Sequence, residues 1–181
     1  PQSNKRAVLC CPNGSGYWAR ETSDGDAKMI DVNDTLPNIT VRDSAEKPVD
    51  LSAIPGPFVL YFYPKADTPG CTREVQEFSG LIGDFKKLGV AIYGISKDKP
   101  KKLAKFIDKY GLKVQLLSDE ASEATEQMGL WIEKSMYGRT FMGIERCTLL
   151  IGKGGKVAEI WHNVKVPGHA EAVLEAARGL G

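Results

Sequence analysis

One cysteine stands where a reactive thiol is expected. Cys71 follows residues 64–70, PKADTPG, which are rich in turn-forming Pro and Gly, and it precedes an amphipathic stretch. This arrangement predicts that Cys71 lies at the N-terminus of a helix, where unpaired backbone N–H groups and the helix dipole favour a thiolate over a thiol. A small buried cysteine at a helix start would give the same pattern, because free cysteine often packs as a hydrophobic residue.

The residues around Cys71 also form a motif. Pro64, Thr68 and Cys71 fit Pro-x-x-x-Thr-x-x-Cys, and the run TPGCT at 68–72 is followed by Glu74. In this motif the sequence resembles the peroxiredoxins, and among them the bacterioferritin-comigratory, or Q, subfamily. Arg146, in the run ERCTL, matches an arginine that the family places ahead of a later apolar strand. The resemblance implies a thiol peroxidase that reduces hydrogen peroxide and organic hydroperoxides through a sulfenic acid on Cys71, with no cofactor.

Physical roles can be assigned to these residues in peroxide reduction. The sulfur must attack in line with the O–O bond while negative charge moves onto the leaving oxygen. Full ionisation of a thiol with an ordinary pKa near 8.5 gains only about 30-fold at pH 7, so oriented donors must supply the rest. Thr68 can bring its hydroxyl near sulfur and peroxide, Arg146 adds charge and N–H donors, and Pro64 shields the sulfur. The alternatives are a turn-stabilising hydroxyl for Thr68 and a surface ion pair for Arg146.

The return of oxidised Cys71 to a thiol departs from the usual subfamily pattern. Many Q-subfamily members carry a resolving cysteine five residues later, where this sequence has Gln76. Cys147 directly follows the arginine on a predicted strand, so an inward arginine turns Cys147 away from Cys71. We expect Cys147 to be buried and unreactive, with a resolving role as the alternative. An external thiol such as thioredoxin, glutaredoxin or a small thiol is favoured as reductant, and Cys10 and Cys11 are the other candidates.

Alternating strands and helices are predicted to position these residues. Residues 58–63, FVLYFY, predict a central strand buried on both faces, and the apolar spacing from Cys71 to Gly89 predicts a helix of about five turns. Further strands are predicted at residues 36–41, 90–95 and 114–117, and helices at 103–110 and 120–128. The last third predicts a hairpin of strands 147–151 and 157–161, followed by a helix that opens at Pro167.

The order of these elements, βαβαβαββα, predicts the fold. It indicates an α/β, thioredoxin-like three-layer sandwich with a mixed central sheet. Residues 29–181 are expected to form this single domain, since 181 residues suit one domain. Residues 1–28 show no periodicity and are interpreted as a flexible N-terminal extension, with Met29 as a candidate natural start.

Composition excludes several functional classes. The chain has 24 Lys and Arg against 23 Asp and Glu, which leaves no global basic field for nucleic acid. No apolar run is long enough for a membrane helix, and residues 7–11 are too short for a signal peptide, so a cytoplasmic location is expected. The protein is also expected to be a monomer or a weak dimer. His162 and His169 have no zinc spacing to the cysteines, so no metal is expected. A redox-inactive thioredoxin-fold binding module is the alternative function, because fold does not fix function.

Overall fold

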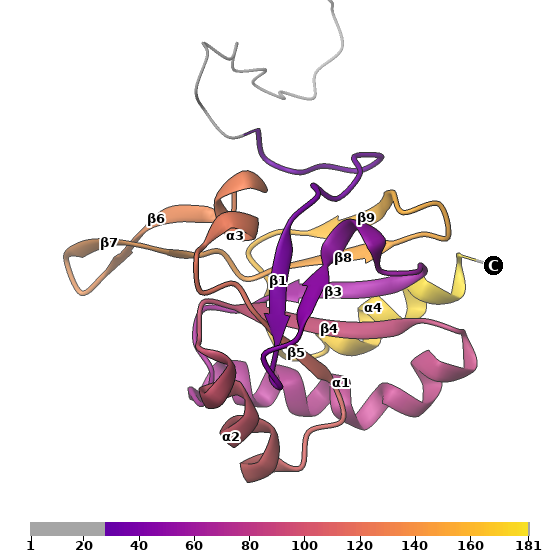
Figure 1. Ribbon diagram of the computed structural model, residues 1–181, viewed down its shortest axis with the longest axis horizontal. Helices are drawn as coiled ribbons and strands as arrows, with labels where there is room; N and C mark the ends of the chain where they lie inside the picture. The colour runs from indigo at the N-terminus through magenta and orange to yellow at the C-terminus, as the bar shows by residue number, and fades with distance from the viewer. Residues whose placement is uncertain (1–27, 181) are drawn as a thin grey trace, which may run out of the picture.

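The computed structural model describes residues 28–180 of the chain (Figure 1). Cys10 and Cys11, and all of the predicted extension except Lys28, lie outside the described residues. The boundary of the extension therefore stays a prediction. Within residues 28–180, no helix is both long and apolar enough to cross a membrane.

The described residues form strands and helices in alternation. The strands are β1 (Thr40–Asp43), β2 (Pro48–Asp50), β3 (Phe58–Phe62), β4 (Ala91–Ser96), β5 (Gln115–Ser118), β6 (Trp131–Met136), β7 (Arg139–Ile144), β8 (Cys147–Ile151) and β9 (Val157–Trp161). The helices are α1 (Pro69–Lys87), α2 (Pro100–Tyr110), α3 (Glu123–Gln127) and α4 (His169–Arg178), with one 3-10 turn at Leu51–Ala53.

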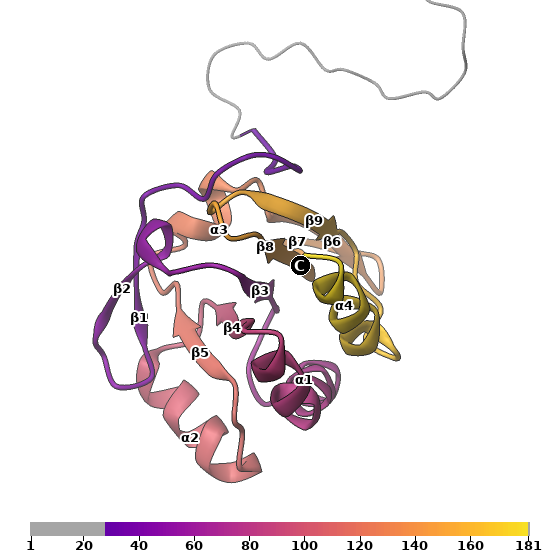
Figure 2. The same cartoon turned by 90° about the vertical axis from the view of Figure 1, so that its right-hand side faces the viewer.

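Seven of these strands form one mixed sheet, as predicted. Their order is β2-β1-β5-β4-β3-β8-β9, in which β3, β4 and β5 are parallel and the remaining neighbours are antiparallel. Helices α1, α2 and α4 cover one face, where their apolar side chains share a cluster with Val59 and Tyr61 (Figure 2). Helix α3 and the segment before β1 cover the other face. The three-layer thioredoxin-like architecture predicted from the element order is confirmed.

Strand β3 lies at the centre of both hydrophobic clusters. All five of its residues are buried; Val59 and Tyr61 face the helical layer, whereas Phe58, Leu60 and Phe62 face the opposite cluster. Continuous apolar residues are what a strand covered on both faces requires. The C-terminal end of β3 is therefore fixed by packing from two sides, and the loop that carries the Cys71 motif begins there.

Helix α1 starts two residues before Cys71. Thr68 is the N-cap residue, with extended backbone angles (φ −107°, ψ 154°), and Pro69 occupies the first turn, where its missing N–H costs no helical hydrogen bond. Val75, Phe78 and Phe85 are buried against the sheet. Because these positions share the face of the helix that meets the sheet, their burial fixes the rotation of α1 and holds Cys71 inward.

Some predicted elements differ from those observed. The strand predicted at residues 36–41 is observed at Thr40–Asp43, because Pro37 has no N–H to donate to a sheet. The helix predicted at 120–128 spans only Glu123–Gln127, and the last helix begins at His169 rather than near Pro167. The predicted hairpin of β8 and β9 is confirmed with the expected bounds.

A second hairpin, β6–β7, was missed. It forms a separate two-stranded sheet that projects from the body of the molecule (Figure 1). Its tight turn is Tyr137-Gly138, both with positive φ (53° and 74°), as the twist of a two-residue hairpin turn demands. Large apolar side chains are exposed along it, namely Met136, Tyr137, Phe141 and Met142.

Candidate active site

The site forms where β3 ends, α1 begins and β8 begins. Strand β3 pairs with β8 in the register Phe62↔Cys147, so the residue before β8, Arg146, is placed beside the loop that follows β3. Cys71 lies in the first turn of α1 with 3% of its surface exposed. Sheet register therefore brings together two residues that are 75 positions apart in sequence.

Arg146 contacts Cys71 and Glu74 at the same time. Its Nη2 donates to Cys71 Sγ at 3.2 Å, and its Nη1 donates to Glu74 Oε2. A Cβ atom at Gly70 would lie 3.4 Å from Nη2, so the glycine leaves room for the guanidinium to approach the first turn of α1. The two donors of the planar guanidinium group are held in fixed directions, one of them toward the sulfur.

Burial and charge have opposing effects at this cluster. Glu74 is almost fully buried, and that burial raises its pKa to about 7 even though Arg146 pulls in the opposite direction. Burial also disfavours the charged form of Arg146, but Glu74 and Cys71 together hold the pKa of the guanidinium above its ordinary value. The site therefore keeps a positive charge next to the sulfur at every physiological pH.

Thr68 and Pro64 lie in the same loop, but neither is seen to hydrogen-bond the sulfur within the described residues. The Thr68 hydroxyl donates to the Lys65 carbonyl at 2.9 Å, and the Thr68 carbonyl accepts from Thr72 N at 2.8 Å. The first bond is the turn-stabilising role that was the alternative for Thr68. Because the hydroxyl proton is engaged, the lone pairs of Thr68 Oγ1 are what it can offer to a donor on a substrate.

Beneath Cys71 the surroundings are aromatic and apolar. Tyr61, Tyr63 and Ala66 belong to the same buried cluster as Cys71, each with 1% or less of its surface exposed. Tyr61 stacks on Phe78 of α1 with ring centroids 4.8 Å apart. Burial raises the pKa of both tyrosines, so they stay neutral and no charge of theirs lies near the sulfur.

The loop between β3 and α1 has two anchors that sequence reasoning missed. Ala66 N donates to Asp98 Oδ2 at 2.6 Å. Asp67 accepts from Lys109 Nζ at 2.9 and 3.0 Å and from the Tyr110 hydroxyl at 2.8 Å. These partners lie on or before α2, 32 to 43 residues further along the chain, so no local pattern predicts them.

Cys147 lies on the opposite side of the sheet from Cys71. It is fully buried in the cluster that contains Leu149 and Ile151, which confirms the expected orientation. Burial and the nearby Glu145 raise the pKa of its thiol. Its reactivity stays a prediction. Gln76, at the position of the usual resolving cysteine, is exposed, and within residues 28–180 no group of three His, Cys, Asp or Glu side chains is placed to hold a metal ion.

Comparisons with known proteins find similar sequences and similar structures. Residues 32–160 match the AhpC/TSA family. The chain is 40% identical over 146 residues to peroxiredoxin Bcp of Escherichia coli, covering 80% of this chain and 94% of that protein. Among solved structures, the bacterioferritin comigratory protein of Xanthomonas campestris is 38% identical with a TM-score of 0.76, covering 82% of this chain and 98% of that one. Peroxiredoxin Q of the same organism gives 39% identity and a TM-score of 0.73, covering 78% and 90%.

Proposed function

This chain belongs to the AhpC/TSA family and is a peroxiredoxin, a thiol peroxidase, and on that basis we propose that Cys71 is the thiol that attacks the peroxide. The observation that carries the proposal is the contact between Arg146 Nη2 and Cys71 Sγ. A fixed guanidinium beside a buried sulfur stabilises the thiolate and the charge that develops on the peroxide during attack.

In the proposed step, Cys71 Sγ attacks one peroxide oxygen as a thiolate. The S–O bond forms as the O–O bond breaks, and the departing oxygen takes up a proton and leaves as water or an alcohol. Arg146 orients the sulfur and stabilises charge, and the lone pairs of Thr68 accept from the O–H of the hydroperoxide. Pro64, half-buried at the start of the loop, limits the access of water.

Hydrogen peroxide and organic hydroperoxides are the proposed substrates. The Xanthomonas campestris relative has alkyl peroxide reduction activity. This chain is 38% identical to that protein, which supports the same class of substrate here.

The sulfenic acid is proposed to return to the thiol by a one-Cys route. An external thiol condenses with the sulfenic acid and releases water, and a second thiol breaks the mixed disulfide. Two observations support this route: Gln76 replaces the usual partner, and Cys147 is buried on the far side of the sheet. Thioredoxin, glutaredoxin or a small thiol is the proposed reductant of a monomeric or weakly dimeric enzyme. A cytoplasmic location completes the proposal, because a cycle that depends on external thiols suits a reducing compartment.

Peroxide consumption in the presence of a thiol donor tests the attacking residue. The wild type and C147S should consume peroxide, and C71S should not. Equal, negligible rates in wild type and C71S would instead support a redox-inactive binding module.

Mapping the products of one equivalent of peroxide tests the one-Cys route. Sulfenic or overoxidised Cys71 should persist in the full chain and in a form that begins at Met29. Quantitative linkage of Cys71 to Cys147 or Cys10 would overturn the route.

A further inference from the structure

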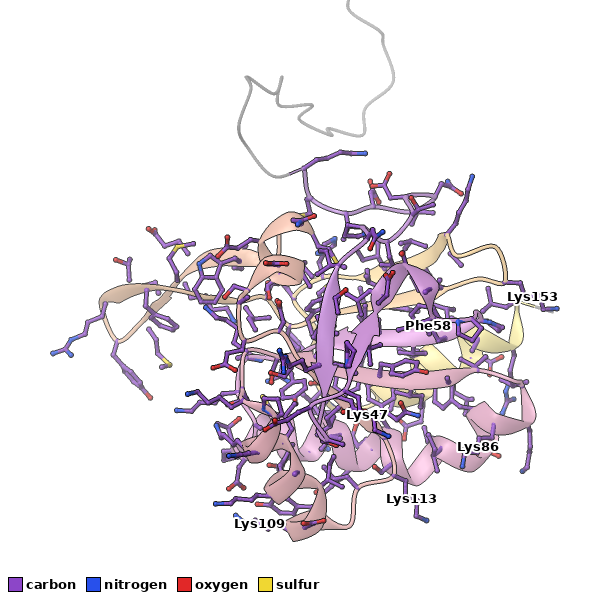
Figure 3. All side chains as sticks on the ribbon, viewed as in Figure 1. Lys47, Phe58, Lys86, Lys109, Lys113 and Lys153 are labelled. Carbon is purple, nitrogen blue, oxygen red and sulfur yellow. The ribbon has the colours of Figure 1, made fainter. Side chains whose placement is uncertain are left out.

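The loop that carries Thr68 into α1 is tied to α2 at an unusual residue. Asp67 has a positive φ of 62°, which residues other than glycine adopt rarely, although aspartate and asparagine tolerate it better than most. Its carboxylate ties the loop to α2, since both oxygens accept from Lys109 Nζ and one also accepts from the Tyr110 hydroxyl. Figure 3 shows Lys109 on α2, the helix that carries this contact to the loop.

The contact is ionic and open to solvent. The hydrogen bonds from Lys109 and Tyr110 lower the pKa of Asp67, and the bond to Asp67 raises the pKa of Lys109, so both groups are charged at neutral pH. The side chains of Asp67 and Lys109 are 39% and 56% exposed. Salt in solution therefore screens this tie, unlike the buried pair of Arg146 and Glu74.

Cys71 and part of this loop are buried together. Cys71 and Ala66 are 3% and 1% exposed and belong to one apolar cluster, so the sulfur is shielded from solvent while the loop stays packed. A small peroxide needs only a narrow entry, whereas the sulfur of a protein thiol must approach Cys71 closely along the axis of the new S–S bond. The frequency of loop opening then limits how fast a protein-sized thiol reaches Cys71.

We propose that Asp67, Lys109 and Tyr110 form a latch that positions the loop and sets how often Cys71 becomes accessible to a protein-sized thiol. The proposal rests on the proposed one-Cys route for its biological use. The equilibrium between the closed and open states of residues 64–72 does not depend on that route. Asp67 acts through the loop and is a positioning residue.

Amide hydrogen exchange of the peptide covering residues 64–72, in the reduced full-length protein, measures the latch directly. D67N is the main variant, because asparagine tolerates a positive φ and keeps the size of the side chain, while it removes the charge and one of the two acceptor oxygens. Exchange in this peptide should accelerate about two- to fivefold, the range for loss of one exposed ion pair. K87M is the matched control, since it breaks an exposed ion pair with Asp84 on α1, and its exchange in residues 64–72 should equal that of wild type.

Labelling of Cys71 supplies a second readout that a purely structural role would not produce. A maleimide carrying a long polymer should react faster with D67N by a similar factor, whereas a small maleimide should gain less. K109R, which keeps the positive charge, should be labelled at the wild-type rate, whereas K109M should be labelled as fast as D67N. In wild type, 1 M salt should accelerate exchange of residues 64–72, and in D67N it should have little effect.

If D67N exchanges residues 64–72 and labels Cys71 at the wild-type rates, the latch proposal is wrong. If D67N also loosens β3 and β8, Y110F and K109M decide the matter on the same peptide, and unchanged exchange in both overturns it. These measurements use reduced protein without peroxide. A wild type that consumes no peroxide would therefore end the proposed function and leave the latch result standing.

Discussion

Replacement of Arg146 by lysine should slow the proposed attack of Cys71 on peroxide far more than it affects folding. Arginine places one N–H on the sulfur at 3.2 Å and another on Glu74, whereas lysine is a single point charge that cannot hold both directions. The variant keeps the positive charge and loses one charge-assisted hydrogen bond in the transition state, about 1.5–3 kcal/mol. At 1.36 kcal/mol for each factor of ten, this predicts a rate about 10- to 150-fold lower.

Rapid mixing with hydrogen peroxide, followed by quenching with a thiol-alkylating reagent, gives the second-order rate constant for oxidation of Cys71. R73K is the matched control, because Arg73 lies on α1 with Cys71, its side chain is 60% exposed, and it pairs with Glu77 rather than with the sulfur. Its rate should equal that of wild type. An R146K rate within threefold of wild type, less than about 0.7 kcal/mol, would refute the role given to the guanidinium.

Three further outcomes are expected. The pKa of the Glu74 carboxyl is near 4.5 in the unfolded chain and about 7 in the folded protein, so its contribution to the free energy of unfolding should fall as pH rises through this window. Chemical denaturation of E74Q should lack that fall. If the free energies of unfolding of E74Q and wild type change with pH in parallel, the assignment is wrong. His169, bonded to Thr148 at 2.8 Å, has its pKa lowered to about 4 by burial and by Arg146, so stability should decline as pH drops from about 6.5 toward 4, and H169Q should flatten this decline. Native Cys147 should resist a polar thiol reagent while Cys71 reacts, and fast modification of Cys147 in the folded protein would show that its burial does not protect it.

The location of the sulfur could be predicted from sequence because its determinants are local. The run of prolines and glycine before Cys71 and the apolar spacing after it define the start of α1, and both were readable. Arg146 was found by resemblance rather than by pattern. Its contact with Cys71 depends on the pairing of β3 with β8, and the register between two strands that are distant in sequence cannot be predicted from either strand alone.

The parts that sequence reasoning missed have physical explanations as well. Glu74 was noted from sequence only as part of the motif, and the structure shows that its carboxylate accepts a hydrogen bond from Arg146. The Asp67 contacts come from side chains more than 40 residues away, which no periodicity reveals. Hairpin β6–β7 has no regular alternation of buried and exposed residues, and only the Tyr137-Gly138 turn signals it.

The projecting hairpin gives this enzyme an oxidisable surface apart from its thiols. Met136 and Met142 are 58% and 48% exposed on it, and a thioether that gains one oxygen becomes a polar sulfoxide. That oxygen adds the same mass as a sulfenic acid on Cys71, so whole-protein mass alone counts the two events together. Prolonged exposure to peroxide therefore converts an apolar hairpin into a polar one, and a heavily oxidised molecule presents a different surface to its surroundings from a fresh one.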